Sequence, residues 1–84
     1  MNWTITKNLP WQQMDGKVLI LNTGENKAHE LNEVASDVWL LITQDKSLEE
    51  INTEIQKTYE IDSVSAKKDV DDLIKEFKEL NLLV

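Results

Sequence analysis

His29 is the only histidine of this chain, and histidine is the residue type that most often exchanges protons or binds metals near neutral pH. A catalytic histidine needs a nucleophile, a second acid or base, or a substrate held beside it, and a metal-binding histidine needs further ligands. His29 instead stands beside Glu30 in a segment that alternates in the manner of a strand, which predicts a surface or half-buried position. We therefore expect neither catalysis nor metal binding at His29, and we do not expect the chain to be an enzyme.

Carboxylates gather at Asp69, Asp71 and Asp72, where a pair could in principle act as acid and base. Lysines flank them in sequence, so a solvated helix face is the better interpretation. The only two glycines are far apart, which excludes a glycine-rich phosphate loop, and the absence of cysteine excludes a thiolate metal site. We expect no cofactor. The absence of cysteine also favours a reducing compartment, so we expect the protein in the cytoplasm.

The net charge of the chain is −7, and every basic residue is a lysine. Without arginine the chain has no guanidinium to read guanine, and its overall field repels a phosphate backbone, so nucleic acid is a poor partner. The first residues, MNWTITKN, do not resemble a signal peptide. No apolar run approaches the roughly 20 residues that cross a bilayer. We expect no membrane association.

A change of periodicity at Asn32 organises the chain. Lys27 to Leu31 alternates as a strand does, whereas Val34, Ala35, Val38 and Trp39 recur at helical spacing. The side chain of Asn32 is suited to cap the new helix, and Glu33 adds negative charge near its positive end. A strand is therefore expected to run directly into a helix.

Turn residues at Asp15-Gly16 and Gly24-Glu25-Asn26 separate further strands. The expected strands are Trp11 to Met14, Lys17 to Thr23 and Lys27 to Leu31, preceded by an extended piece at Trp3 to Thr6 that stops near Leu9-Pro10.

Three amphipathic helices are expected after these strands. The first runs from about Glu33 to Thr43, the second starts at Ser47 with a capping box to Glu50, and the third follows Ile61-Asp62-Ser63 and ends near Asn81. Leu82 to Val84 form an apolar tail that packs or adds a last strand. The pattern predicts one α+β domain over residues 1–84 with a winged-helix outline, built from an extension (1–10), a three-stranded antiparallel meander (11–31), three helices (33–80) and a tail (81–84).

The strand at Lys27 to Leu31 offers unpaired backbone if it lies at the sheet edge, and the third helix beside it would complete a groove for an extended peptide. Val70, Leu73, Ile74 and Phe77 are available as apolar walls, although core positions are equally consistent with their spacing and are favoured for Val70 and Leu73. The same edge could instead pair with a second copy of the chain to form a homodimer, so the sequence leaves the oligomeric state open. Of the three tryptophans, Trp39 is expected in the core, while Trp3 and Trp11 cover one sheet face or form a binding surface.

The order HELNEVASDVW, SLEEI, YEI, KDVDDLI and LNLL, beginning at His29, Ser47, Tyr59, Lys68 and Leu80, resembles the PqqD-like family. This family comprises precursor-peptide recognition domains, also called recognition elements, of pathways that modify ribosomally made peptides. The resemblance covers residues from about 15 to 84. It implies a winged-helix-like fold, no enzymatic activity, and a leader peptide bound as an added strand between the third strand and the third helix. It also implies delivery of that peptide to a separate enzyme, such as a radical-SAM maturase, a cyclodehydratase or a lasso-pathway leader peptidase.

By position, the resemblance implies a pairing strand and a helix wall. The strand comprises Lys27, Ala28, His29, Glu30 and Leu31, and the wall comprises Lys68, Asp69, Asp72, Leu73, Glu76 and Phe77.

The chain departs from the family at two turns, where Asp45-Lys46 and Asn81 replace common glycines. The acidic net charge favours a leader that is basic or mainly apolar at the contact. The alternatives are a winged-helix regulator of DNA or protein, and a protein-binding adaptor outside a peptide pathway. DNA is disfavoured because the third helix carries four lysines against five carboxylates.

Overall fold

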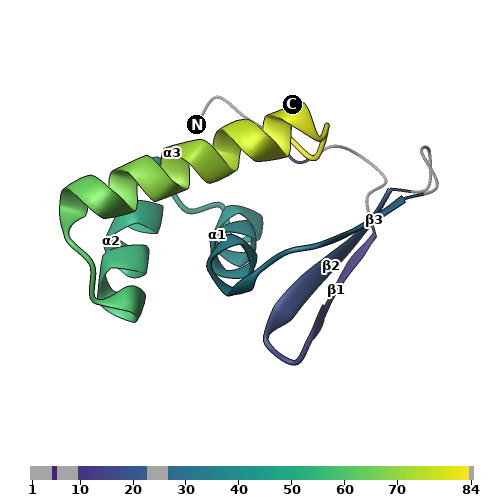
Figure 1. Ribbon diagram of the computed structural model, residues 1–84, viewed down its shortest axis with the longest axis horizontal. Coiled ribbons are helices and arrows are strands. Elements are labelled where there is room, and N and C mark those ends of the chain that lie inside the picture. The colour runs from purple at the N-terminus through teal and green to yellow at the C-terminus, as the bar shows by residue number, and fades with distance from the viewer. Residues whose placement is uncertain (1–4, 6–9, 23–26, 84) are drawn as a thin grey trace.

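The computed structural model describes residues 5, 10–22 and 27–83 and contains one sheet followed by three helices (Figure 1). Its elements are β1 (Trp11–Met14), β2 (Lys17–Asn22), β3 (Lys27–Glu30), α1 (Glu33–Thr43), α2 (Leu48–Tyr59) and α3 (Ser63–Glu79). The sheet is antiparallel with the order β1-β2-β3. The α+β, winged-helix-like fold predicted from the sequence is confirmed. The described residues leave out residue 23 and the turn at 24–26. Of the extended piece at 3–6 they include only Ile5.

The β1–β2 hairpin follows directly from Asp15-Gly16. Both residues adopt positive φ, 52° for Asp15 and 79° for Gly16. That geometry matches the twist of the flanking strands, and aspartate and glycine are among the residues that tolerate it best. The turn sets a register in which Trp11 pairs with Ile20 and Met14 with Lys17.

Each helix begins at a polar cap. Asn32 accepts a hydrogen bond from the Ala35 amide, Ser47 and Glu50 form the predicted capping box, and Asp62 accepts from the Ser65 amide. The Ser65 amide holds the pKa of the Asp62 carboxyl below its usual value, and the Ser47 amide does the same for Glu50. These caps satisfy amides that the first helical turn leaves without partners.

The segments after the helices turn through left-handed residues. Asp45 has φ 59°, Glu60 has φ 54° and Asn81 has φ 61°. Asp45 and Asn81 therefore adopt the conformation that glycine adopts easily, which explains how the chain departs from the family pattern without losing the turns.

The core lies between the three helices and the inner face of β2. Val18 and Ile20 of β2 are fully buried with Trp39 of α1, and Phe77 of α3 is 1% exposed. The Trp39 ring stands edge-on to Phe77, with centroids 5.7 Å apart, and edge-on to Trp11, at 6.5 Å. The core position predicted for Trp39 is confirmed, and Trp11 covers the inner sheet face while staying 38% exposed.

Helix α3 crosses α1 and α2, while the sheet stands beside α1 (Figure 1). A contact between the helices also involves polar groups, since the Tyr59 hydroxyl of α2 donates to Asp37 of α1. Burial, then the bond to Asp37, raises the pKa of Tyr59.

The chain returns to the core after α3. Leu82 and Leu83 are buried, the Leu82 amide donates to the Phe77 carbonyl at 2.8 Å, and Leu83 forms an antiparallel bridge with Ile5. The expectation that the tail packs is confirmed for Leu82 and Leu83, and Val84 lies outside the described residues. No helix in the described part of the chain is long and apolar enough to span a membrane.

Candidate functional site

β3 is an edge strand, and its backbone has a defined outward side. Leu31 donates its amide to the Val18 carbonyl at 2.9 Å, and the register places Ile20 opposite His29. Bonding toward one neighbour alternates along an antiparallel strand, so residues 27, 29 and 31 point their amides and carbonyls toward β2. Ala28 and Glu30 therefore point theirs away from the sheet.

The buried hydroxyl of Ser36 fixes the end of this edge. The Val18 amide donates to Ser36 Oγ at 2.8 Å, and Ser36 Oγ donates to the Leu31 carbonyl at 3.2 Å. Ser36 lies in the first turns of α1 and is fully buried. The hydroxyl thus bridges the Val18 amide and the Leu31 carbonyl, in place of the second ladder bond of this residue pair. It also ties the strand to the helix that follows.

A cavity of about 290 Å³ opens where this junction meets α3. It is lined by Asn32, Val34, Asp69, Asp72, Leu73 and Glu76. No Cα atom of β3 lies within 8 Å of a Cα atom of α3. Since paired strands are spaced roughly 4.8 Å apart, the free side of β3 has no backbone neighbour from α3 at pairing distance.

The predicted strand residues form this edge. Lys27, Ala28 and Glu30 are exposed, His29 is half-buried, and Leu31 is buried just after the strand. His29 shares the inner face with Ile20, and its Nε2 atom is buried without a hydrogen-bond partner among the described residues. The half-buried strand position predicted for His29 is confirmed.

The predicted helix residues divide into three groups. Asp69, Asp72, Leu73 and Glu76 line the cavity together. Lys68 lines a different cleft, between α2 and α3, whose rim Asp72 also reaches. Phe77 is buried against Trp39 and offers no surface to a partner, and Val70 and Ile74 are buried as well. Of the four apolar residues considered as walls, only Leu73 lies at the cavity.

Asn32 and Val34 are cavity residues that the sequence patterns assigned other roles. Asn32 reads as a helix cap and Val34 as part of the apolar stripe, yet both line the cavity. The signal that points to them is the short junction, because a helix that starts with only two residues between it and an edge strand places its first turn at the end of that edge.

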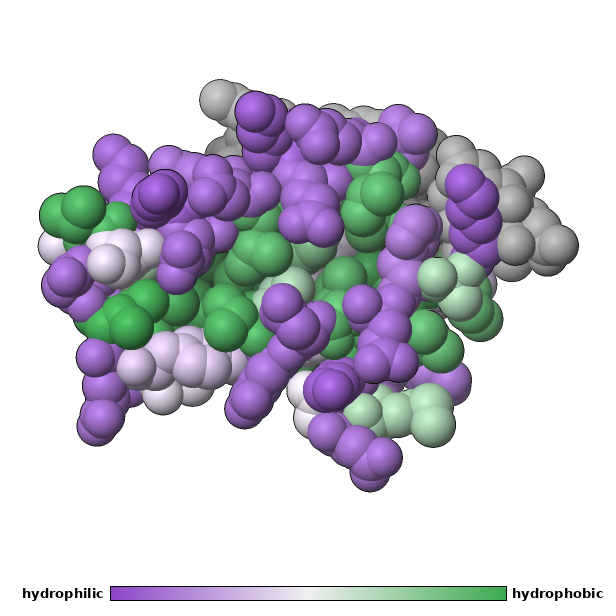
Figure 2. Space-filling model, in the orientation of Figure 1, coloured by the Kyte–Doolittle hydropathy of each residue, from purple (hydrophilic) through white to green (hydrophobic). Residues whose placement is uncertain are grey.

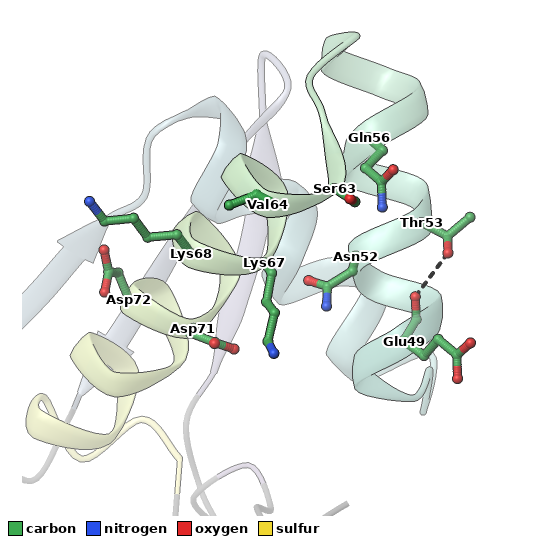
Figure 3. Close-up of a pocket in the computed structure, with 10 residues that line it drawn as sticks. All are labelled: Glu49, Asn52, Thr53, Gln56, Ser63, Val64, Lys67, Lys68, Asp71 and Asp72. Atoms are coloured by element: carbon green, nitrogen blue, oxygen red, sulfur yellow. Dashed lines mark hydrogen bonds between the residues drawn. The ribbon is translucent and has the colours of Figure 1, made fainter.

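The cleft between α2 and α3 is larger, about 800 Å³, and of mixed polarity. Figure 3 shows Asn52 extending toward α3, and Lys68 and Asp72 lying next to each other on the side of α3 away from α2. Glu49, Lys67 and Asp71 add both signs of charge. Among the described residues, no group of three or more side chains is placed to hold a metal ion.

Figure 2 shows hydrophobic side chains surfacing in a band between α3 and the elements beneath it, bordered by hydrophilic side chains. An apolar strip with a hydrophilic border is typical of a surface that binds another chain.

Solved structures with the same fold are bound to peptides. One, described as TbiB1 in complex with the TbiA(beta) leader peptide, matches with a TM-score of 0.89 and 25% identity over 95% of this chain and 93% of that one. A lasso peptide synthetase B1 complexed with the leader peptide matches with a TM-score of 0.91 and 17% identity over 100% of this chain and 99% of that one.

Comparison of the sequence with curated proteins gives no match. The family model described as coenzyme PQQ synthesis protein D (PqqD) matches residues 17–83, which include β2, β3 and all three helices. The chain therefore belongs to the PqqD family.

Proposed function

We propose that this protein binds the leader region of a ribosomally synthesised precursor peptide as an additional strand on β3, on the side that faces α3. Family membership and the two leader-bound structures of the same fold support this function. The observation that carries it is the free edge of β3, where Ala28 and Glu30 point their backbone groups away from β2 next to the cavity at α3.

The backbone supplies pairing but little affinity. Two outward-facing residues offer two amides and two carbonyls, and four hydrogen bonds at roughly 0.5–1.5 kcal/mol each contribute about 2–6 kcal/mol. Association costs roughly 4–15 kcal/mol in lost translational and rotational freedom. Side-chain contacts at Leu73 and Val34 must therefore supply the remaining free energy and the selectivity.

The protein itself is a non-catalytic partner in this proposal, and it presents the bound leader to a separate maturation enzyme in the cytoplasm, where the precursor is made. The resemblance to a lasso peptide synthetase B1 favours a lasso-type leader peptidase as that enzyme. A radical-SAM maturase or a cyclodehydratase are the other classes to test.

Titration of ¹⁵N-labelled protein with the leader encoded by a precursor gene adjacent to the gene for this chain tests the binding mode. The amides of Ala28 and Glu30 should shift most, because they gain partners, whereas the His29 amide already bonds to β2. A leader N-methylated at every second residue should lose binding when the methylated amides are those that bond to β3. It should retain binding when the methyl groups are on the residues in between. Saturable shifts confined to the α2–α3 cleft would overturn the strand-addition proposal.

Maturation of the precursor by the neighbouring enzyme, measured with and without this protein, tests the proposed delivery. The rate at low precursor concentration should rise when the protein is added. An unchanged rate with each adjacent enzyme, despite leader binding, would contradict delivery and leave a peptide-binding adaptor.

A further inference from the structure

The cavity beside β3 has an unequal distribution of charge. Asp69, Asp72 and Glu76 contribute three carboxylates, and no lysine lines it. These residues recur with Leu73 at helical spacings of three and four, so they occupy one face of α3. The helix therefore presents an acidic wall to this cavity, at the end of β3 where α1 begins.

Lys67 and Lys68 of α3 neutralise this wall only in part. Lys67 lines the cleft toward α2, whereas Lys68 lies on the side of α3 away from α2. Figure 3 places Lys68 next to Asp72. Three carboxylates against one lysine leave the wall acidic, and the net charge of the chain, −7, reinforces the field.

The base of the cavity is apolar. Leu73 and Val34 are both half-buried and line the cavity from two different helices. A side chain that fills this space needs an aliphatic stem to cover Leu73 and Val34 and a cationic end to reach the carboxylates at the rim. Lysine and arginine have both properties.

The strand register connects the cavity to the peptide edge. A peptide strand paired with Ala28 and Glu30 points the residue opposite Leu31 toward the inner face, since side chains of directly opposed residues share a face. Asn32 follows Leu31 and lines the cavity. The inward-facing peptide residue at this end of β3 is thus the one that reaches it.

We propose that this cavity is a specificity subsite that takes a lysine or arginine side chain of the leader peptide. The inference rests on the proposed leader-binding function and deepens it, because it states which peptide residue is selected and by which side chains. The backbone of β3 accepts any extended sequence, and the acidic wall of α3 distinguishes among them.

The experiment compares the leader encoded beside this gene with versions in which each basic residue in turn is replaced by norleucine. Norleucine keeps the aliphatic stem and removes the charge. One replacement should weaken binding about fivefold, and the loss should shrink at high salt, as expected for exposed carboxylates. The other replacements should have smaller effects.

The matched protein variants are D69N/D72N/E76Q and the control E49Q/D71N/E79Q, which changes the net charge equally at exposed positions outside the cavity. The first should weaken binding of the unmodified leader about tenfold and abolish its preference over the norleucine version. The control should keep that preference. Circular dichroism confirms folding of both.

The outcomes separate the two proposals. A leader that shifts the Ala28 and Glu30 amides but tolerates every norleucine replacement, or that contains no basic residue, overturns the subsite and leaves strand addition intact. Equal losses in the two triple variants also overturn it, because the effect then comes from net charge. A leader that does not bind overturns both proposals.

Discussion

The two edges of the sheet expose similar backbone but have different surroundings. On β1, the bond from the Leu21 amide to the Pro10 carbonyl directs residues 10, 12 and 14 toward β2, so Trp11 and Gln13 point their backbone groups outward. On β3, Ala28 and Glu30 point their backbone groups outward. Only β3 runs directly into a helix whose first turn shares a cavity with α3.

The inner side of β1 is covered differently, because the Trp11 ring packs edge-on against Trp39. An unpaired edge is therefore not sufficient for a site. In the proposed function, the cavity at the end of β3 adds the apolar and charged contacts that would distinguish one peptide from another.

The largest expected effect concerns the division of α3 between core and cavity. Phe77→Ala should destabilise the fold by about 3–5 kcal/mol because it removes a buried ring that packs on Trp39. Leu73→Ala should cost about 1 kcal/mol, since Leu73 is half-buried at the cavity, while it should weaken leader binding. Urea unfolding measures both. Equal destabilisation by the two substitutions would contradict the assignment of Leu73 to the cavity at the end of β3 and of Phe77 to the core.

Ser36→Ala tests what fixes β3 but not β1. The change leaves the Val18 amide buried without its partner, which should cost about 1–3 kcal/mol. Hydrogen exchange should accelerate at Val18 and Leu31 more than at Leu21, whose amide bonds on the β1 side. Ser63→Ala, at the exposed start of α3, is the control and should leave all three amides unchanged. Uniform acceleration at all three in Ser36→Ala would mean that Ser36 serves the whole sheet.

Proline substitutions compare the two edges directly. Ala28→Pro removes an outward amide without breaking a β2 bond, and proline is tolerated at such edge positions. Leader affinity, measured by calorimetry, should fall about tenfold, from one lost hydrogen bond and a ring in the path of the peptide. Gln13→Pro makes the matched change on β1 and should leave affinity unchanged. A loss on β1 and none on β3 would reverse the assignment of the binding edge.

The smallest expected effect separates stability from recognition. Glu60 follows α2 with φ 54°, so Glu60→Gly should stabilise the fold by about 0.5–1 kcal/mol, whereas Glu54→Gly inside α2 should destabilise it by about 1 kcal/mol. Both residues lie away from the two edges, and leader affinity should stay constant in both. Thermal unfolding and calorimetry measure the pair. A change in affinity would mean that α2 contributes to recognition.

Local patterns in the sequence predicted the framework because the forces that set it act over a few residues. Asn32, Ser47 and Asp62 are caps whose partners lie three residues ahead, and Asp15-Gly16 determines its own hairpin. The cavity depends on the rotation of α3 relative to α1, which no local pattern contains. Leu73 and Phe77 are one turn apart and equally apolar, and only tertiary packing places one at the cavity and the other in the core.

Ser36 is a polar example of the same dependence on tertiary packing. A serine within a helical stripe resembles a tolerated small residue, yet it bonds to Val18, which is 18 positions away in sequence. The contribution of its hydroxyl to the edge could not be predicted from helix propensity.

The shortness of β3 also affects how long a peptide paired with it would stay bound. Only Ala28 and Glu30 offer outward backbone, and the Leu31 carbonyl already accepts from Ser36. A partner that pairs along so short a strand can detach by breaking few bonds, so its residence time is governed by the side chains seated at α3. In the proposed delivery function, neutralising or displacing one anchoring side chain would therefore shorten the time for which the leader peptide stays bound.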